Sequence, residues 1–334
     1  MDRREFLRDA GFAGLALGGT CHPGSSLLAQ TAINHAGRID VHHHYRLPEM
    51  PSRGIGSAWS AATALRDMDR HNVATAIISG TRFPEPLNDG TQAARDLARR
   101  ANDFAAGHGR DHPGRFGFFA AVPLADTDGS LREIEYAFDT LNADGVTMQS
   151  SAAGMWPGDP SQMAVFEELN RRKTTVFLHP NTTIFCCQNP PGVPRFVAEL
   201  DNDVNRAVLS LLWNGVLTNY PDINFIVAHT GGTVPALAGR IQDRVPEDRP
   251  DLYPHGALDK LRRLYLELGH ASFPWVVAGA LEFSGPSRLL FGTDYPVEPH
   301  ETTTRYIPSL GLPPDVLYAM ERGNAERIFS NFRS

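Results

Sequence analysis

The sequence is poor in cysteine. Three cysteines stand among its 334 residues, and two of them, Cys186 and Cys187, are adjacent. Three cysteines do not supply the paired framework of a disulfide-rich domain or the Cys pairs of a zinc knuckle. Adjacent cysteines also pair poorly with each other, so we assign the Cys186-Cys187 pair no catalytic role.

An excess of basic residues and a long apolar run are also absent. Lys and Arg number 31 against 38 Asp and Glu, which gives a net charge of -7 with histidine neutral. This balance argues against a nucleic-acid partner, which would require a basic face. No run approaches the roughly 20 apolar residues that a membrane helix needs. With 42% hydrophobic and 21% charged residues, the chain has the composition of a globular protein that can bury a large core.

The first 30 residues differ in character from the rest. Paired arginines in "DRREFLR" (residues 2–8) precede a weakly apolar stretch rich in Gly and Ala, "AGFAGLALGG". This pattern is typical of a twin-arginine export signal, with cleavage near Ala29; an amphipathic N-terminal helix is the alternative. We expect residues 1–30 to be a signal peptide and the protein to be periplasmic or secreted.

After residue 37, eight short apolar runs alternate with helical patterns. Most runs show little alternation, as expected for strands buried on both faces of a parallel sheet. Eight strand–helix units predict an α/β fold, a TIM-like (β/α)8 barrel over residues 37–334. An open doubly wound sheet is the alternative, but no G-x-G-x-x-G follows the first run. The runs cover residues 38–44, 74–80, 115–124, 144–150, 174–180, 224–232, 263–269 and 288–296.

Helical patterns fill the segments between these runs. The pattern before the sixth run covers residues 201–221 and ends in Tyr-Pro. Proline lacks the amide hydrogen that a helix interior requires. We therefore predict one helix over this segment, ended by Pro221.

Side chains that bind metals stand where four of the predicted strands end. The carboxyl ends of barrel strands meet at one mouth, where barrel enzymes carry their chemistry. A single such histidine is more often structural, and a single Asp is more often a turn or helix cap, but the joint pattern predicts a metal site. His270 follows the seventh run and could border the same pocket. The residues are His42, His43 and His44 in the first run, His179 in the fifth, His229 in the sixth and Asp294 in the eighth.

The three consecutive histidines are not equivalent. Side chains of a strand point to opposite faces in alternation, so His42 and His44 share a face and His43 points away. If the pair faces the barrel interior, it can hold one ion. His43 would then pack toward the helices or form a hydrogen bond behind the site.

Four short motifs, "DVHHH", "FLHP", "AHTGG" and "FGTDYP", resemble in order and spacing the amidohydrolase superfamily. The resemblance is to the branch that includes aminocarboxymuconate-semialdehyde decarboxylase, and residues 115–151 look most like the 6-methylsalicylate decarboxylase group. It implies that one divalent ion is bound by His42, His44, His179 and Asp294. It also implies that His229 acts on the metal-bound water or on the substrate.

The resemblance has further implications for the site. Many members carry a bridging lysine at the end of strand four, whereas "GVTMQS" here has none, which implies a mononuclear site. Neutral imidazoles and one carboxylate suit Zn²⁺, although Mn²⁺ would also be accepted. Arg240 matches an arginine that reaches the substrate carboxylate of a neighbouring subunit, which implies a homodimer; a solvated helix residue is the alternative. Arg46, or Arg53, could also bind a carboxylate through two hydrogen bonds.

These features predict a metal-dependent non-oxidative decarboxylase. Its substrate would be a small aromatic or unsaturated carboxylic acid, such as a hydroxybenzoate similar to 6-methylsalicylate, with His229 or Asp294 as the general acid. The alternative is hydrolysis of a lactone, amide or ester at the same metal site. A non-catalytic metal-binding barrel is a further alternative. No organic cofactor is indicated.

Overall fold

The computed structural model describes residues 37–49, 59–80, 87, 89–181 and 191–332. The predicted signal peptide over residues 1–30, Arg53 and the Cys186-Cys187 pair lie outside the described residues. Within the described ranges, no helix combines the length and the apolar character that crossing a bilayer demands.

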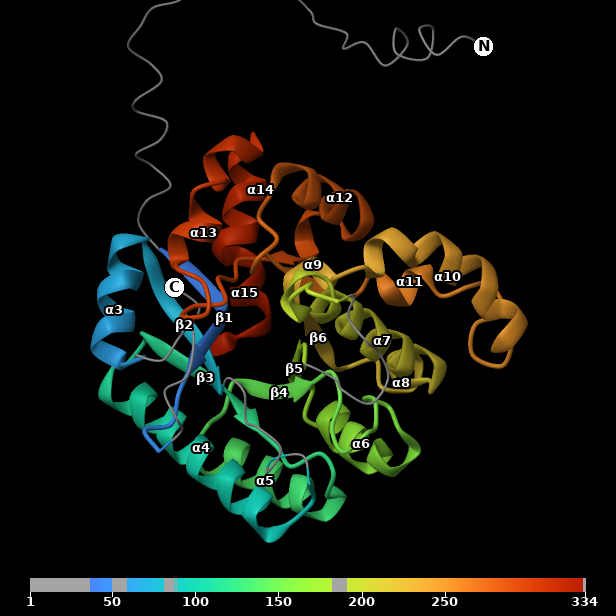
Figure 1. The fold of residues 1–334 in the computed structure, drawn as a ribbon, viewed down its shortest axis with the longest axis horizontal. Helices are drawn as coiled ribbons and strands as arrows, with labels where there is room; N and C mark the ends of the chain where they lie inside the picture. Colours follow the sequence, from blue (N-terminus) through green and yellow to red (C-terminus); the bar gives the residue numbers. More distant parts are fainter. Residues whose placement is uncertain (1–36, 50–58, 81–86, 88, 182–190, 333–334) are drawn as a thin grey trace, which may run out of the picture. The chain divides into compact units, whose positions relative to one another are not determined.

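Eight parallel strands follow one another in sequence order around a single sheet, and helices surround the sheet (Figure 1). This arrangement confirms the predicted (β/α)8 barrel. Val, Ile and Phe recur in the strands at residues 73–80, 175–179 and 224–227, and most residues of these strands are buried, as expected for a parallel sheet covered on both faces. The strands are β1 Arg38–Tyr45, β2 Val73–Gly80, β3 Phe116–Ala121, β4 Gly145–Gln149, β5 Thr175–His179, β6 Asn224–Val227, β7 Tyr265–Glu267 and β8 Leu289–Leu290.

Two of the helices, α3 and α4, begin where a side chain caps a free backbone amide. Ser60 accepts a hydrogen bond from the Thr63 amide at the start of α3, and Thr91 does the same for the Ala94 amide at α4, as N-cap residues do. The helices are α3 Ala61–Arg70, α4 Gln92–Asp111, α5 Thr127–Asp139, α6 Met163–Arg171, α7 Glu199–Trp213, α8 Val216–Asn219, α9 Ala228–Gly231, α10 Val234–Asp248, α11 Leu258–Leu261, α12 Pro274–Ser284, α13 His300–Thr304, α14 Pro314–Tyr318 and α15 Asn324–Ile328.

The prediction of one helix over residues 201–221 is wrong. The segment forms two helices, α7 and α8, separated by Gly215. Gly215 has a φ of 77°, a left-handed conformation that glycine adopts without steric cost and that ends many helices. Pro221 lies beyond the end of α8 and does not terminate a continuous helix.

The barrel closes between its longest strand and its shortest. β1 has eight residues and β8 only two, so the chain after β8 completes the closure outside regular strand geometry. The Val41 amide donates to the Phe291 carbonyl over 3.0 Å, and the Asp294 amide donates to the His42 carbonyl over 2.7 Å. Asp294 has a φ of 61°. The predicted eighth strand over residues 288–296 is therefore too long, because left-handed backbone at Asp294 cannot continue a strand.

An irregularity in β1 places two kinds of side chain inside the barrel. From Asp40 to His43 the strand advances three residues while β2 advances two, from Ala76 to Ile78. This extra residue is a β-bulge, a feature that often re-aims side chains beside active sites. Consequently Val41 contributes to the apolar interior and His42, the next residue, also faces inward.

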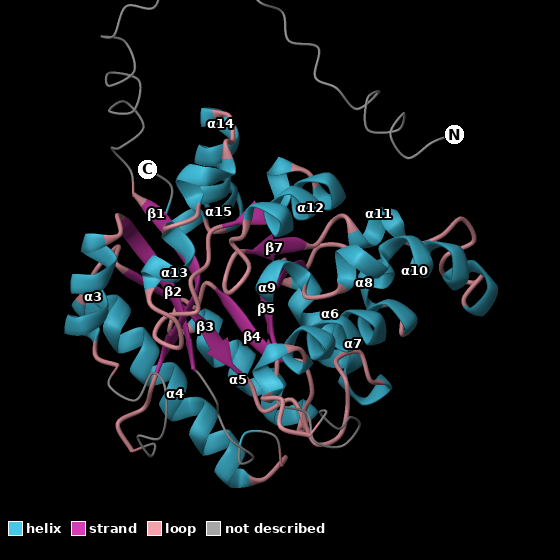
Figure 2. Cartoon of the chain, turned by 45° about the horizontal axis from the view of Figure 1, so that its top comes forward, coloured by secondary structure: helices cyan, strands magenta, loops and turns pink. Residues whose placement is uncertain are grey.

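The interior below the histidines is apolar. Residues from seven of the eight strands meet in one buried cluster, which is possible only inside the barrel. Larger apolar layers fill the space between the sheet and the helices, which cover it from outside (Figure 2). The Phe177 ring lies 4.8 Å from the His42 ring, so it forms the floor of the histidine site. The cluster comprises Ile39, Val41, Ile77, Phe119, Phe177, Ile226, Ala228, Tyr265, Leu290, Ala325 and Phe329.

Candidate metal centre

The four side chains predicted as metal ligands come together at the carboxyl ends of the strands. One ligand atom from each of His42, His44, His179 and Asp294 lies within 4.8 Å of the others. The Nε2 atoms of His42 and His44 are 3.0 Å apart. Asp294 Oδ1 lies 3.2 Å from the first nitrogen and 3.0 Å from the second. The His179 ring packs edge to face against the ring of His44 at 4.7 Å.

The donor atoms fit a divalent cation. Ligands of a tetrahedral zinc ion are about 3.3 Å apart, since each bond is about 2.0–2.1 Å long, and the spacing of the His42, His44 and Asp294 atoms is close to this value. Asp294 Oδ1 is buried and accepts no hydrogen bond of normal geometry among the described residues. A buried carboxylate oxygen without a partner is costly, and a bound cation would satisfy it.

The protonation states of the histidines also suit a cation. Burial, together with His44 and His42, holds the pKa of His179 well below its ordinary value, so this imidazole is neutral. Burial lowers the pKa of His42, but Glu267 and Asp294 outweigh it and raise the pKa to about 10. His42 would therefore carry a proton that an incoming cation displaces, because metal binding and protonation compete for the same nitrogen.

Glu267, which the sequence analysis did not single out, lies directly behind His42. Its Oε1 atom accepts from His42 Nδ1 over 2.9 Å and from the His229 amide over 2.6 Å. A Cβ atom on Gly292 would lie 1.9 Å from Glu267 Oε2, so a residue without a side chain is required there. Glu267 is fully buried and orients His42 with Nε2 toward the cluster, as carboxylates behind metal-binding histidines do. An acid inside the apolar run "LYLELG" was the signal for it.

His229 lies just beyond β6, in the short turn α9 rather than in the strand, because its φ is 55°. The predicted sixth strand over residues 224–232 is accordingly too long. The His229 ring stacks on the His42 ring at 5.5 Å. Its Nδ1 atom is 3.2 Å from Asp201 Oδ1, and its Nε2 atom is 3.8 Å from Asp294 Oδ2.

Two carboxylates next to His229 favour its protonated form. Burial lowers the pKa of His229, but the Asp201 and Asp294 carboxylates raise it to about 9. Its Nε2 atom is buried and makes no hydrogen bond among the described residues. The ring therefore presents an N–H group next to the candidate ligands with no protein acceptor of its own.

Asp294 connects both groups of histidines. Oδ1 faces His42 and His44, whereas Oδ2 is 2.6 Å from Nε2 of His270. Burial favours the neutral acid, but His42, His229 and His270 outweigh it and hold the pKa of Asp294 well below its ordinary value. His270 thus borders the site, as the sequence suggested, with its side chain 34% exposed.

His43 points away from the cluster, into a second buried network. Its Nδ1 atom is 3.3 Å from Asp40 Oδ2, and its Nε2 atom is 3.4 Å from the Trp59 indole nitrogen. Asp40 also accepts from the His42 amide over 3.1 Å and from the Thr293 hydroxyl over 2.6 Å. Asp40, missed from the sequence, therefore holds β1 to the segment that carries Asp294.

The predicted substrate-binding arginines do not join this cluster. Arg240 is exposed on α10, and Arg46 is half-buried directly after β1. Across the residues that the structure describes, neither side chain forms an ion pair or a hydrogen bond. At the end of β4, Met148 is buried and Gln149 is half-buried, so no lysine from this strand faces the ligands.

Known proteins match nearly the whole barrel. A family model described as amidohydrolase matches residues 39–330. A decarboxylase from Penicillium terrestre is 30% identical, over 89% of this chain and 96% of its own length. A 6-methylsalicylic acid decarboxylase from Penicillium expansum is also 30% identical, over 89% of this chain and 97% of its own. A crystal structure of a dihydroxybenzoic acid decarboxylase from Polaromonas, with manganese and the inhibitor 2-nitroresorcinol, has the same fold. Its TM-score is 0.76 at 22% identity, over 90% of this chain and 98% of its own.

Glu267→Gln should weaken metal binding while the barrel stays folded. The amide keeps the shape of the side chain but removes the charge that orients His42, and loss of such a partner typically weakens affinity about 10–100-fold. Competition of the metal-free protein with a chelating dye for Zn²⁺ and Mn²⁺ measures this. Glu282→Gln, on the exposed side of α12, is the matched control. Equal affinities in both variants would show that Glu267 does not support the centre.

Proposed function

Because the chain belongs to the amidohydrolase family, we propose that it is a metal-dependent non-oxidative decarboxylase of a small aromatic carboxylic acid. The hydroxybenzoate class, with 6-methylsalicylate as its model, fits the name of the Penicillium expansum relative, which is 30% identical over 97% of its own length. The observation that carries the proposal is the buried Nε2 atom of His229, which lies 3.8 Å from Asp294 Oδ2 and makes no hydrogen bond among the described residues. Decarboxylation of an aromatic ring requires such a proton donor.

One divalent ion per chain would complete the site. Three histidines and one carboxylate favour Zn²⁺, with Mn²⁺ as the alternative. When held by His42, His44, His179 and Asp294, the ion would supply Lewis acidity toward the oxygens of the substrate. His42 and His44 are buried and the Phe177 ring lies directly against the His42 ring, which excludes water from below.

The proton chemistry belongs to His229. Its Nε2–H group donates a proton to the ring carbon that bears the carboxylate, and the carbon–carbon bond then breaks, its electron pair returning to the ring as carbon dioxide leaves. Asp201 accepts a hydrogen bond from Nδ1 throughout and stabilises the charged imidazole. Asp294, the other candidate acid, is a poor donor because its pKa is held well below the ordinary range. A positioned acid of this kind contributes about 10²–10⁴-fold to a rate.

Carbon dioxide release separates the proposal from the hydrolase alternative. The metal-loaded protein is incubated with a panel of hydroxybenzoates that includes 6-methylsalicylate, and with a panel of lactones. Carbon dioxide is followed by a coupled assay, and acid release by pH-stat titration. We expect carbon dioxide from at least one ortho-hydroxybenzoate and no acid from the lactones. Acid release from lactones alone would establish a hydrolase instead.

His229→Asn should retain the metal and lose about 100-fold or more of the decarboxylation rate. Asp201→Asn should retain partial activity but shift its pH profile. Since Asp201 raises the pKa of His229, removing its charge lowers that pKa, and the loss of activity at high pH then begins at a lower pH. His255→Asn, an exposed histidine, is the control. Loss of metal from His229→Asn would make His229 a ligand and remove it as the acid.

We further propose that the enzyme works as a homodimer in which Arg240 binds the substrate carboxylate in the partner's site. The exposed position of Arg240 on α10 leaves it available for such a contact.

We also propose that the protein is exported by the twin-arginine route, with residues 1–30 as the signal. A periplasmic product about 30 residues shorter than the full chain is the expected form, and fractionation with mass spectrometry checks it.

Mixed dimers test the role of Arg240. Arg240→Gln should raise KM for the acid substrate, whereas Arg244→Gln, an exposed arginine one turn further along α10, should not. When Arg240→Gln and His229→Asn chains are mixed, a hybrid dimer regains one site with both residues, so the rate at low substrate concentration should exceed the sum of the rates of the two variants measured separately. A rate no higher than that sum would mean that Arg240 does not act across subunits.

A further inference from the structure

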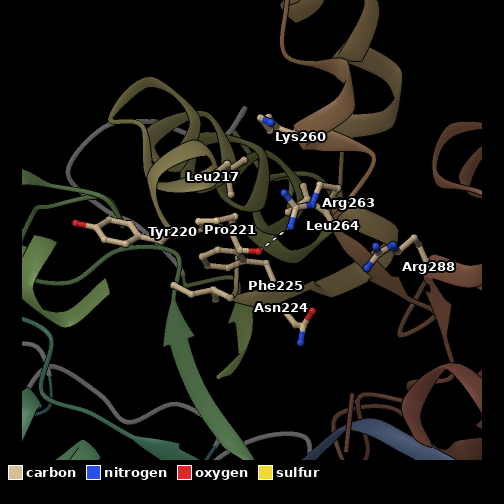
Figure 3. A pocket seen from close by; sticks show the side chains of 10 residues that line it. Leu217, Tyr220, Pro221, Asn224, Phe225, Lys260, Arg263, Leu264 and Arg288 are labelled. Atoms are coloured by element: carbon tan, nitrogen blue, oxygen red, sulfur yellow. Dashed lines mark hydrogen bonds between the residues drawn. The ribbon is translucent and has the colours of Figure 1, made fainter. Parts of the chain in front are cut away.

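A pocket lies at the end of the barrel opposite to the metal centre. It is placed where β6, β7 and β8 begin, and its volume is about 60 Å³. Barrel enzymes carry substrate at the other end, beyond the carboxyl ends of the strands, so this pocket is separate from the proposed active site. Figure 3 shows its lining, which consists of Leu217, Tyr220, Pro221, Ile223, Asn224, Phe225, Lys260, Arg263, Leu264 and Arg288.

The charge of the pocket is opposite to that of the chain. Lys260, Arg263 and Arg288 line it, and the lining includes no Asp or Glu, although the chain as a whole has 38 acidic residues against 31 basic ones. Leu217 and Phe225, together with the polar side chains of Tyr220 and Asn224, are among the residues that form the rest of its wall. The Lys260 ammonium pairs with the Asp259 carboxylate over 3.0 Å, so the two arginines supply the unpaired positive charge.

Both guanidinium groups are held by contacts that leave hydrogen-bond donors unused. Arg263 Nη2 donates to the Pro221 carbonyl over 2.7 Å, which is the dashed line in Figure 3. The Arg288 guanidinium lies 4.5 Å from the centre of the Tyr265 ring. Among the described residues, neither group pairs with a carboxylate. A guanidinium carries five N–H donors in a fixed fork, so the pocket offers several donors without the entropy cost of ordering free side chains.

We propose that this pocket binds a small tetrahedral oxyanion of the phosphate class. A single-charged carboxylate would pair with one guanidinium, whereas a phosphate group carries about −1.5 to −2 at neutral pH and offers three or more acceptor oxygens to two guanidiniums. The volume exceeds the roughly 10–15 Å³ that one water molecule needs by several-fold, which suits one such ion. The inference does not depend on the proposed reaction.

The position of the pocket gives the bound ion a structural effect. Asn224 begins β6, Leu264 directly precedes β7, and Arg288 directly precedes β8. These three strands are the shortest in the barrel, with four, three and two residues. An ion that joins Arg263 to Arg288 therefore ties together the starts of the strands that have the fewest backbone hydrogen bonds between them.

Calorimetric titration of the metal-loaded protein with inorganic phosphate tests the proposal, with sodium chloride at equal ionic strength as the reference. We expect saturable binding of one phosphate per chain and a rise in Tm that follows its concentration. Arg263→Gln and Arg288→Gln should each weaken binding about tenfold or more, since each removes a charged donor. Arg262→Gln removes the same charge one residue away from the lining and should bind like the unaltered protein.

Hydrogen exchange locates the effect. Phosphate should slow exchange of the amides of β6, β7 and β8 more than those of β2 and β3, and Arg288→Gln should abolish the difference. Methyl phosphate distinguishes the source: binding as tight as that of phosphate identifies a phosphate monoester as a ligand, and weaker binding identifies the free ion. Chloride giving the same rise in Tm, or phosphate binding that persists in both arginine variants, would place the anion elsewhere and overturn the proposal.

Discussion

One of the backbone hydrogen bonds that close the barrel also brings two candidate metal ligands together. The Asp294 amide donates to the His42 carbonyl over 2.7 Å, and this bond links the first strand to the segment after the last. The two residues that it joins also supply two of the four candidate ligands. Closing the barrel and assembling the ligands are therefore the same event, because residues 252 positions apart in sequence meet only when the ring of strands is complete. The side chain of Asp40 strengthens this junction through the His42 amide and the Thr293 hydroxyl.

Three carboxylates around the site, those of Asp40, Glu267 and Asp294, are buried and compensated, whereas the Asp201 side chain is 46% exposed. Glu267 and Asp40 are fully buried, and Asp294 nearly so. Burying a charge without a partner would cost roughly several kcal/mol of folding free energy. Each of these carboxylates, however, faces histidines or backbone amides. The negative charge of these carboxylates stabilises the three closely spaced imidazoles and favours the binding of a divalent cation. The same charge sets the roles of the histidines, since His179 stays neutral among other histidines while His229 keeps its proton between Asp201 and Asp294.

The sequence predicted most of the fold because runs of Val, Ile and Phe mark strands that are buried on both faces. It also predicted which polar residues gather, since the ends of parallel strands share one rim. It did not predict Glu267, whose acid sits within an apolar run, or Asp201, whose helix brings it to His229 across a loop. The sixth and eighth strands are shorter than the sequence predicted. Both end before a residue with left-handed backbone, His229 or Asp294, and these residue types do not normally favour that conformation.

The bulge in β1 has a consequence for the run of three histidines. Identical neighbours contain no information about which of them should face inward, and a strand without the extra residue could place His43 with Ile39 and Val41 on the inner face. Asp40 removes this ambiguity, because it accepts from the His42 amide and from the ring of His43 and so fixes the step at which the bulge occurs. Asp40 therefore determines that His42, and not His43, faces the metal centre, although its carboxylate contacts none of the ligand nitrogen atoms of the cluster.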